Sequence, residues 1–158
     1  MKNIKSVLFV CTGNSCRSIM AEGLLKKYLK EAGRTDIEVS SSGILPLEGL
    51  KPTAETIQVM KDEGVDVSSY KSRPLTAEII KKADLILVME ELHRQEVMNS
   101  VPDAGSRTCL LRGYYNCASK AVNNIALGVR DPIGRSMEDY KASKEMIKKE
   151  IERIVKLL

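Results

Sequence analysis

Hydrophobic and polar positions change along the chain in blocks that predict strands and helices in alternation. Short, almost wholly apolar runs are typical of strands in a parallel sheet, which is covered on both faces. The predicted strands span residues 4–10, 37–43, 85–89 and 107–113. Apolar residues at helical spacing predict helices over 17–32, 51–65, part of 72–83, 90–100 and from Ser136 to the end. This order predicts an α/β fold, a doubly wound four-stranded parallel sheet with helices on both faces.

Length and composition favour one ordinary globular domain over residues 1–158. The chain is 43% hydrophobic and 29% charged, and no stretch is long and apolar enough to span a membrane or serve as a signal segment. We therefore expect a cytoplasmic protein without a membrane partner. Its four cysteines are expected to be thiols, not a disulfide framework. The net charge of +4 is spread along the chain, and no nucleic-acid partner is expected.

The stretch VCTGNSCRS (10–18) lies between the first predicted strand and the first predicted helix. Ligands of such sheets bind beyond the carboxyl ends of strands, and the N–H groups of a tight loop and helix N-terminus favour anions such as phosphate. There the thiolate of Cys11 is stabilised as a nucleophile, while the planar fork of Arg17 suits two phosphate oxygens. Ser18 can donate a hydrogen bond to the sulfur. The predicted phosphate-binding residues are Thr12, Gly13, Asn14, Ser15, Cys16, Arg17 and Ser18.

Thiolate attack on a phosphorylated compound needs an acid that protonates the departing atom. Asp131 stands out among the carboxylates because it precedes Pro132 in a predicted turn, whereas most of the others lie on lysine-rich helical faces. His93 is the single histidine, and we expect it to be an exposed helix residue. No metal-ligand spacing is present, so neither a metal nor another cofactor is expected.

The segments VCTGNSCRS, MAEG, SSG, SRPLT, ADLILVM and RDPIG, in this order, resemble the low-molecular-weight protein phosphatase family. The resemblance implies hydrolysis of phosphorylated proteins through a phosphocysteine, with Cys11 as nucleophile, Arg17 as phosphate clamp and Asp131 as general acid. It also implies that the loop is braced by Asn14, Ser18 and Ser42. Tyr70 departs from the family, many of whose members have a bracing histidine there.

The resemblance also bears on the substrate. Phosphotyrosine members commonly place aromatic residues around the pocket, whereas this chain has Ile133 and Gly134 after its Asp-Pro pair and no aromatic residue in 44–50. At the position of Ser15, tyrosine-selective members usually have isoleucine and the phosphoarginine-selective branch has threonine. The small hydroxyl of Ser15 favours phosphoarginine, with phosphotyrosine as the second substrate.

Two other functions stay open. The loop is also very similar to that of thioredoxin-coupled arsenate reductases, but these have two further cysteines after the third strand, and residues 88–105 contain none. Cys109 and Cys117 come later, and we expect one buried thiol and one loop thiol. A non-catalytic phosphoprotein-binding module would not need both Cys11 and Asp131. If the chain is an enzyme, Cys16 is the expected redox partner of Cys11.

Overall fold

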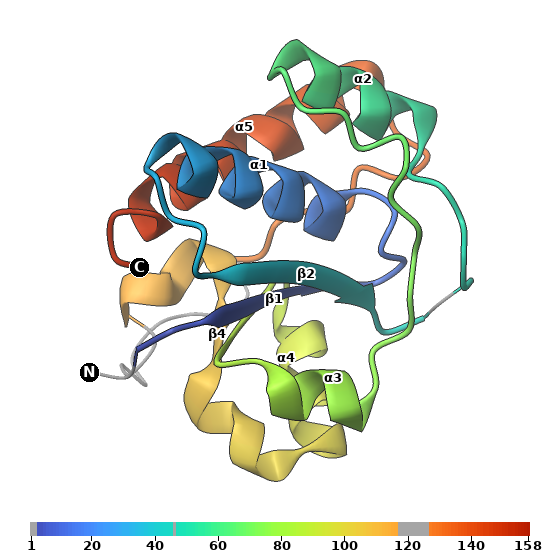
Figure 1. The fold of residues 1–158 in the computed structure, drawn as a ribbon. Coiled ribbons are helices and arrows are strands. Elements are labelled where there is room, and N and C mark those ends of the chain that lie inside the picture. The colour runs from blue at the N-terminus through green and yellow to red at the C-terminus, as the bar shows by residue number, and fades with distance from the viewer. Residues whose placement is uncertain (1–2, 46, 117–126) are drawn as a thin grey trace.

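The computed structural model describes residues 3–45, 47–116 and 127–158 (Figure 1). The strands are β1 (Ser6–Cys11), β2 (Glu38–Gly43), β3 (Leu85–Val88) and β4 (Thr108–Leu110). The α-helices are α1 (Arg17–Glu31), α2 (Ala54–Asp62), α3 (Ala77–Lys82), α4 (Glu91–Ser100) and α5 (Met137–Ile154). Two 3₁₀ segments, η1 (Pro102–Arg107) and η2 (Leu111–Asn116), flank β4. Each predicted strand and helix is therefore found, with shorter bounds in most cases.

The four strands form one parallel sheet in the order β2-β1-β3-β4. The chain leaves the central strand β1 for β2 on one side and then crosses to β3 on the other, which makes the end of β1 a topological switch point. The register pairs Cys11 with Gly43, and Val10 with both Ser42 and Val88. The predicted doubly wound α/β sheet is confirmed, and its carboxyl edge brings the ends of three strands together.

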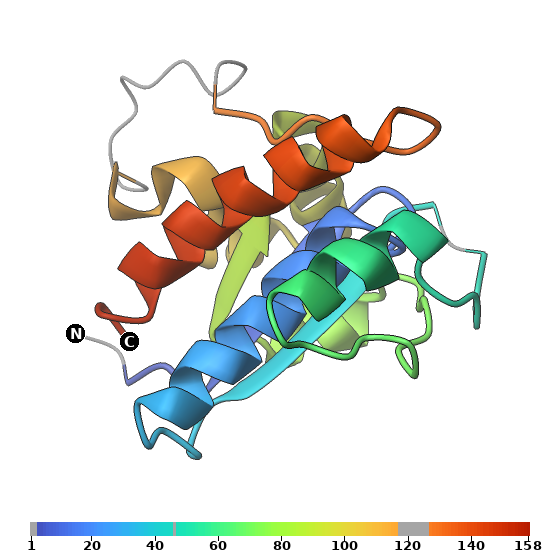
Figure 2. The ribbon, with the colours of Figure 1, turned by 90° about the horizontal axis from the view of Figure 1, so that it is seen from above.

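The side chains of β1 alternate between two hydrophobic cores, one on each face of the sheet. Val7, Phe9 and Cys11 join the larger core, which α1, α2 and α5 cover. Leu8 and Val10 join the smaller core beneath α3 and α4. Figure 1 shows the two helical layers on either side of the strands, and Figure 2 shows α1, α2 and α5 lying over the sheet. All five side chains are at most 2% exposed, which explains why the strand is an uninterrupted apolar run.

The last helix begins where its sequence predicted. The hydroxyl of Ser136 accepts a hydrogen bond from the backbone N–H of Asp139, and the carboxylate of Asp139 accepts one in return. Most of the expected core face is buried, whereas Leu158 is only partly buried. The buried members of that face are Tyr140, Ile147, Ile151 and Ile154.

One cysteine prediction is wrong. Cys109 is buried in β4, as expected for one of the two thiols, but it is disulfide-bonded. Sequence spacing alone does not show which cysteines a fold brings together, and that is why the bond was missed. Cys117 lies outside the described residues, while Cys11 and Cys16 are free thiols.

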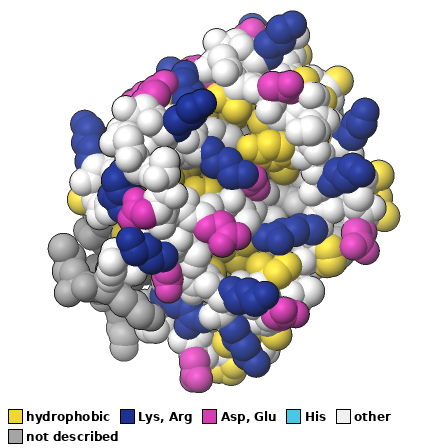
Figure 3. All heavy atoms as spheres, viewed as in Figure 1, with side chains coloured by type: hydrophobic (Ala, Val, Ile, Leu, Met, Phe, Trp, Pro, Cys, Tyr) yellow, Lys and Arg dark blue, Asp and Glu magenta, His cyan; other side chains and the backbone are white. Residues whose placement is uncertain are grey.

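Charge is mixed on the surface. Figure 3 shows basic and acidic side chains interspersed over one face of the molecule. None of the helices in 3–45, 47–116 and 127–158 is both long and apolar enough to cross a membrane.

Candidate active site

Residues 12–16 form a tight loop between the carboxyl end of β1 and the first turn of α1. Asn14 has a left-handed backbone, with φ of 51°, a conformation that asparagine tolerates better than most residues. The loop also packs directly on the end of β2, where a Cβ on Gly43 would lie 2.7 Å from the carbonyl oxygen of Thr12. Glycine is therefore required at this strand end for the loop to approach so closely.

The thiol of Cys11 lies at the end of a directed chain of hydrogen bonds. The Oδ1 atom of Asn14 accepts from the backbone N–H of Arg73 at 3.0 Å, which fixes the orientation of the amide. Its Nδ2 group therefore donates to the hydroxyl of Ser18 at 2.7 Å. Ser18 then has its own proton free to donate to Cys11 Sγ, 2.9 Å away. This direction stabilises a thiolate.

The same amide holds the loop to β2, through Ser41 instead of the predicted Ser42. Asn14 Nδ2 also donates to Ser41 Oγ at 2.9 Å, and Ser41 donates to the buried carboxylate of Glu22 at 2.6 Å. Ser42 Oγ is buried and has no hydrogen-bond partner among the described residues, so the bracing prediction is wrong for Ser42. Successive strand residues face opposite sides, and only Ser41 shares the face of α1.

Tyr70 stands at the position where many members of the similar family have a bracing histidine, and here it packs against Lys26. Lys26 Nζ lies 5.1 Å from the centroid of the Tyr70 ring and 2.6 Å from Glu22 Oε2. Burial raises the pKa of the half-buried Tyr70 hydroxyl. The network therefore reaches from Asn14 through Ser41 and Glu22 to the partly exposed Lys26, and Tyr70 packs against that lysine.

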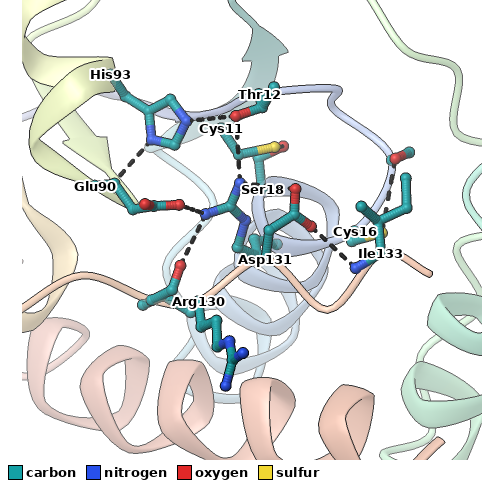
Figure 4. Close-up of polar contacts among 12 residues, drawn as sticks. Cys11, Thr12, Cys16, Ser18, Glu90, His93, Arg130, Asp131 and Ile133 are labelled. Carbon is teal, nitrogen blue, oxygen red and sulfur yellow. Dashed lines mark hydrogen bonds and ion pairs between the residues drawn. The ribbon is translucent and has the colours of Figure 1, made fainter. Parts of the chain in front are cut away.

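Arg17 is buried at the start of α1, and its guanidinium is held by groups from two distant segments. Its Nη1 atom pairs with the carboxylate of Glu90 and donates to the carbonyl oxygen of Val129 at 2.8 Å. Its Nη2 atom lies 3.4 Å from Oδ2 of Asp131 (Figure 4). The predicted acid and the predicted clamp are thus brought together. Glu90 was not predicted, although its place just beyond the third strand, next to β1, was a usable signal.

The prediction that His93 is exposed is wrong. The ring is fully buried, its Nε2 atom lies 2.9 Å from Thr12 Oγ1, and its Nδ1 atom accepts the backbone N–H of Glu90 at 3.0 Å. Burial, and secondly the charge of Arg17, lower the pKa of His93 to about 3. The apolar spacing of α4 is weak, so no pattern along the helix indicates that this polar residue is buried.

Cys16 contacts a different set of residues from the Cys11–Ser18 pair. Its Sγ atom lies 3.6 Å from Thr53 Oγ1 and 3.8 Å from the hydroxyl of Tyr140, which belong to the α2 and α5 side of the molecule. Burial raises the pKa of Tyr140 to about 12. Ser15 is less buried, with its hydroxyl 3.6 Å from Cys16 Sγ. The loop thus places a thiol, an arginine and a helix N-terminus close together, an arrangement able to bind and attack a tetrahedral anion.

Comparison with known proteins agrees with this geometry. Residues 6–158 match the family described as low molecular weight phosphotyrosine protein phosphatase. An arsenate reductase of Halalkalibacterium halodurans is 42% identical over an alignment of 144 positions, and the match covers 87% of this chain and 96% of the reductase.

Two solved structures have the same fold. The low molecular weight protein tyrosine phosphatase of T. tengcongensis has a TM-score of 0.86 and 32% identity, covering 98% of this chain and 99% of that one. A YwlE arginine phosphatase mutant, in which serine replaces cysteine and the active-site serine is phosphorylated, has a TM-score of 0.85 and 27% identity. That match covers 97% of this chain and 95% of the mutant.

Proposed function

Because this chain belongs to the low-molecular-weight phosphotyrosine protein phosphatase family, whose members are hydrolases, we propose that it dephosphorylates proteins through a phosphocysteine on Cys11. The observation that carries the proposal is the directed Asn14–Ser18–Cys11 chain of hydrogen bonds beside the buried guanidinium of Arg17. The phosphorylated active-site serine of the related arginine phosphatase mutant supports a covalent route.

In the first step, Cys11 Sγ attacks phosphorus while the bond from phosphorus to the leaving nitrogen or oxygen breaks. Asp131 gives its proton to the leaving atom, and Arg17 with the loop N–H groups stabilises the equatorial oxygens. In the second step, Asp131 takes a proton from water, which attacks phosphorus and releases Cys11 as a thiolate. The hydroxyl of Ser18, 2.9 Å from Sγ, stabilises that thiolate, because a thiolate can only accept and the serine must then donate. No step changes an oxidation state.

Phosphoarginine on proteins is the substrate that we favour, with phosphotyrosine as the second. Ser15 provides a hydroxyl on the loop between the nucleophile and the clamp, and the side chain of Asp131, beside Arg17, is 37% exposed. A guanidinium needs such hydrogen-bond acceptors, whereas a phenol ring is best held by apolar or aromatic walls. Ile133, close to Asp131, is exposed and aliphatic, and this apolar side chain is the feature that keeps phosphotyrosine as the second substrate. The similarity to an arginine phosphatase supports the same substrate.

Arsenate reduction is the second candidate function because a 42% identical relative is an arsenate reductase. A reductase that relays a disulfide needs further thiols beyond Cys11, and residues 88–105 contain no cysteine. Cys109 is already disulfide-bonded, which leaves Cys16 as the only other thiol near the loop among the described residues. We therefore rank this function below phosphatase activity.

We further propose that the protein acts in the cytoplasm.

One preparation of the protein decides among these functions. Turnover of phosphoarginine peptides, phosphotyrosine peptides and arsenate is measured under identical conditions, with Cys11→Ser as the matched inactive control. We expect phosphate release from both peptides, faster from phosphoarginine, and none from the control. Arsenate-dependent loss of thiols with no phosphate release would overturn the phosphatase proposal.

A further inference from the structure

The buried ring of His93 connects helix α4 to the anion-binding loop. One ring nitrogen, Nδ1, accepts the backbone N–H of Glu90 at the start of α4, and the other, Nε2, lies 2.9 Å from the hydroxyl of Thr12 (Figure 4). Thr12 directly follows the nucleophile Cys11. The ring is therefore part of the wall behind the loop, in contact with a side chain of the loop itself.

The hydrogen bond to Glu90 fixes which ring nitrogen carries the proton. A neutral imidazole has one donor and one acceptor nitrogen, and Nδ1 must be the acceptor because a backbone N–H points to it. The proton therefore lies on Nε2, which donates to Thr12 Oγ1. The ring is neutral at physiological pH because burial lowers the pKa of His93.

Thr12 is thereby an acceptor in both of its contacts. Its second contact, with Nη2 of Arg17, is longer at 3.4 Å, and a guanidinium can only donate. A hydroxyl has two acceptor lone pairs and one proton, so the proton of Thr12 is directed away from both His93 and Arg17. The hydroxyl therefore keeps its proton for a third partner, and Thr12 lies in the anion-binding loop directly after Cys11.

We propose that His93 is a positioning residue that makes the Thr12 hydroxyl a hydrogen-bond donor to the phosphoryl group held in this loop. The proposal rests on the proposed function for the identity of the anion. Arg17 and the loop N–H groups supply most of the binding, and Thr12 adds a donor whose direction depends on a residue from another segment. The substrate class that benefits is one with a free, charged oxygen on phosphorus next to Thr12.

Substitutions at two positions separate this role from a purely structural one. In His93→Asn, the side-chain oxygen can replace Nδ1 as acceptor for the Glu90 N–H but cannot reach Thr12, so the start of α4 is kept and the donor is lost. Thr12→Val removes the hydroxyl at almost constant shape, and Thr12→Ser retains it. The probe is inorganic phosphate, whose dissociation constant is measured by calorimetry on the folded variants. Thermal unfolding verifies that each variant is folded.

We expect His93→Asn and Thr12→Val each to weaken phosphate binding about tenfold, the usual effect of losing one hydrogen bond to a charged group. Thr12→Ser should bind almost like the wild type. Because His93 acts through Thr12, the double variant should bind no more weakly than Thr12→Val alone.

An equal, independent loss from His93→Asn in the Thr12→Val background would overturn the proposal, as would unchanged affinity in Thr12→Val. Unchanged phosphate affinity in Thr12→Val would overturn the proposal even if His93→Asn does not fold. Wild-type turnover of the phosphopeptides is scored separately. A wild-type protein that binds phosphate without hydrolysing phosphopeptides would overturn the proposed function and leave this binding test intact.

Discussion

The carboxylate of Asp131 and the guanidinium of Arg17 lie 3.4 Å apart, measured from Oδ2 to Nη2. The other carboxylate oxygen, Oδ1, accepts the backbone N–H of Ile133 at 3.1 Å, so the turn that follows Asp131 holds the side chain over the loop. The carboxylate is thereby held beside the guanidinium that clamps phosphate in the proposed mechanism.

Replacing Asp131 with Asn should lower turnover selectively. Substrates with poor leaving groups should lose about a hundredfold or more in kcat, because the departing atom is no longer protonated. An aryl phosphate whose phenolate leaves easily should lose much less. The measurement is kcat for a series of aryl phosphates of increasing phenol pKa. Equal losses across the series would show that Asp131 is not the acid.

Ser41 and Ser42 form a matched pair for testing the bracing of the loop. Ser41→Ala removes the link between Asn14 and Glu22 and leaves a buried carboxylate short of a donor, so stability should fall by about 1–3 kcal/mol and kcat/KM with it. Ser42→Ala should change both quantities little, because its hydroxyl has no hydrogen-bond partner among the described residues. Urea unfolding and steady-state kinetics measure the two effects. The opposite ranking would count against the network.

The adjacent serines also show which structural features cannot be predicted from the sequence. The four strands, the loop after β1 and the cap at Ser136 follow from local patterns, because periodicity and turn residues act over a few positions. Which of Ser41 and Ser42 meets Asn14 depends on the exact pleat of β2. A one-residue difference turns a side chain to the other face.

The contacts of Arg17 and His93 could not be predicted for a different reason. Cys11, Arg17 and Ser18 belong to one short motif, whereas Glu90 and His93 reach the loop only through the packing of α4. Nothing in the spacing of the helix distinguishes a buried polar residue from an exposed one. The sequence predicts that Asp131 lies in a turn and is the candidate acid. Its contact with Arg17 is seen only in the three-dimensional structure.

The substrate preference should respond to Ser15. A β-branched apolar side chain there would fill the space beside a phenol ring and leave a guanidinium without an acceptor. Ser15→Ile should therefore lower kcat/KM for phosphoarginine peptides by roughly ten- to a hundredfold relative to phosphotyrosine peptides, and Ser15→Thr should change it little. If the wild type already prefers phosphotyrosine and Ser15→Ile leaves the ratio unmoved, phosphotyrosine is the substrate.

Mild peroxide should inactivate the enzyme reversibly. Cys11 is the thiol in the anion-stabilising loop, and Cys16 lies in the same short loop, so oxidised Cys11 should form a disulfide with Cys16 that a dithiol reduces. Cys16 Sγ now contacts Thr53 and Tyr140, and it must turn for the bond to form. Peptide mapping measures the pairing. In the control Cys16→Ser, dithiol should restore less activity. Over-oxidised Cys11 without any bond to Cys16 would contradict this prediction.

Acid should destabilise the protein partly through His93. The unfolded ring binds a proton below about pH 6.5, whereas the native ring stays neutral to about pH 3. Its contribution to stability is therefore fully present above pH 6.5 and is lost as the pH falls toward 3, by about 1.4 kcal/mol per unit. Between pH 7 and 4.5, His93→Asn should lose about 2–3 kcal/mol less stability than the wild type in urea unfolding. Parallel losses in both proteins would mean that the native ring titrates normally.

The partners of the Arg17 guanidinium come from three parts of the chain, and this bears on how the protein refolds. The segment that contains Val129 and Asp131 is joined to the end of β3 by a hydrogen bond of 2.8 Å from the Val129 N–H to the Met89 carbonyl oxygen. Contacts between such distant segments form late, because closing long loops costs entropy that only the finished core offsets. After dilution from denaturant, helical signal should therefore return before activity. The delay between the helical signal and the activity would measure how long the segment that contains Val129 and Asp131 takes to reach the loop.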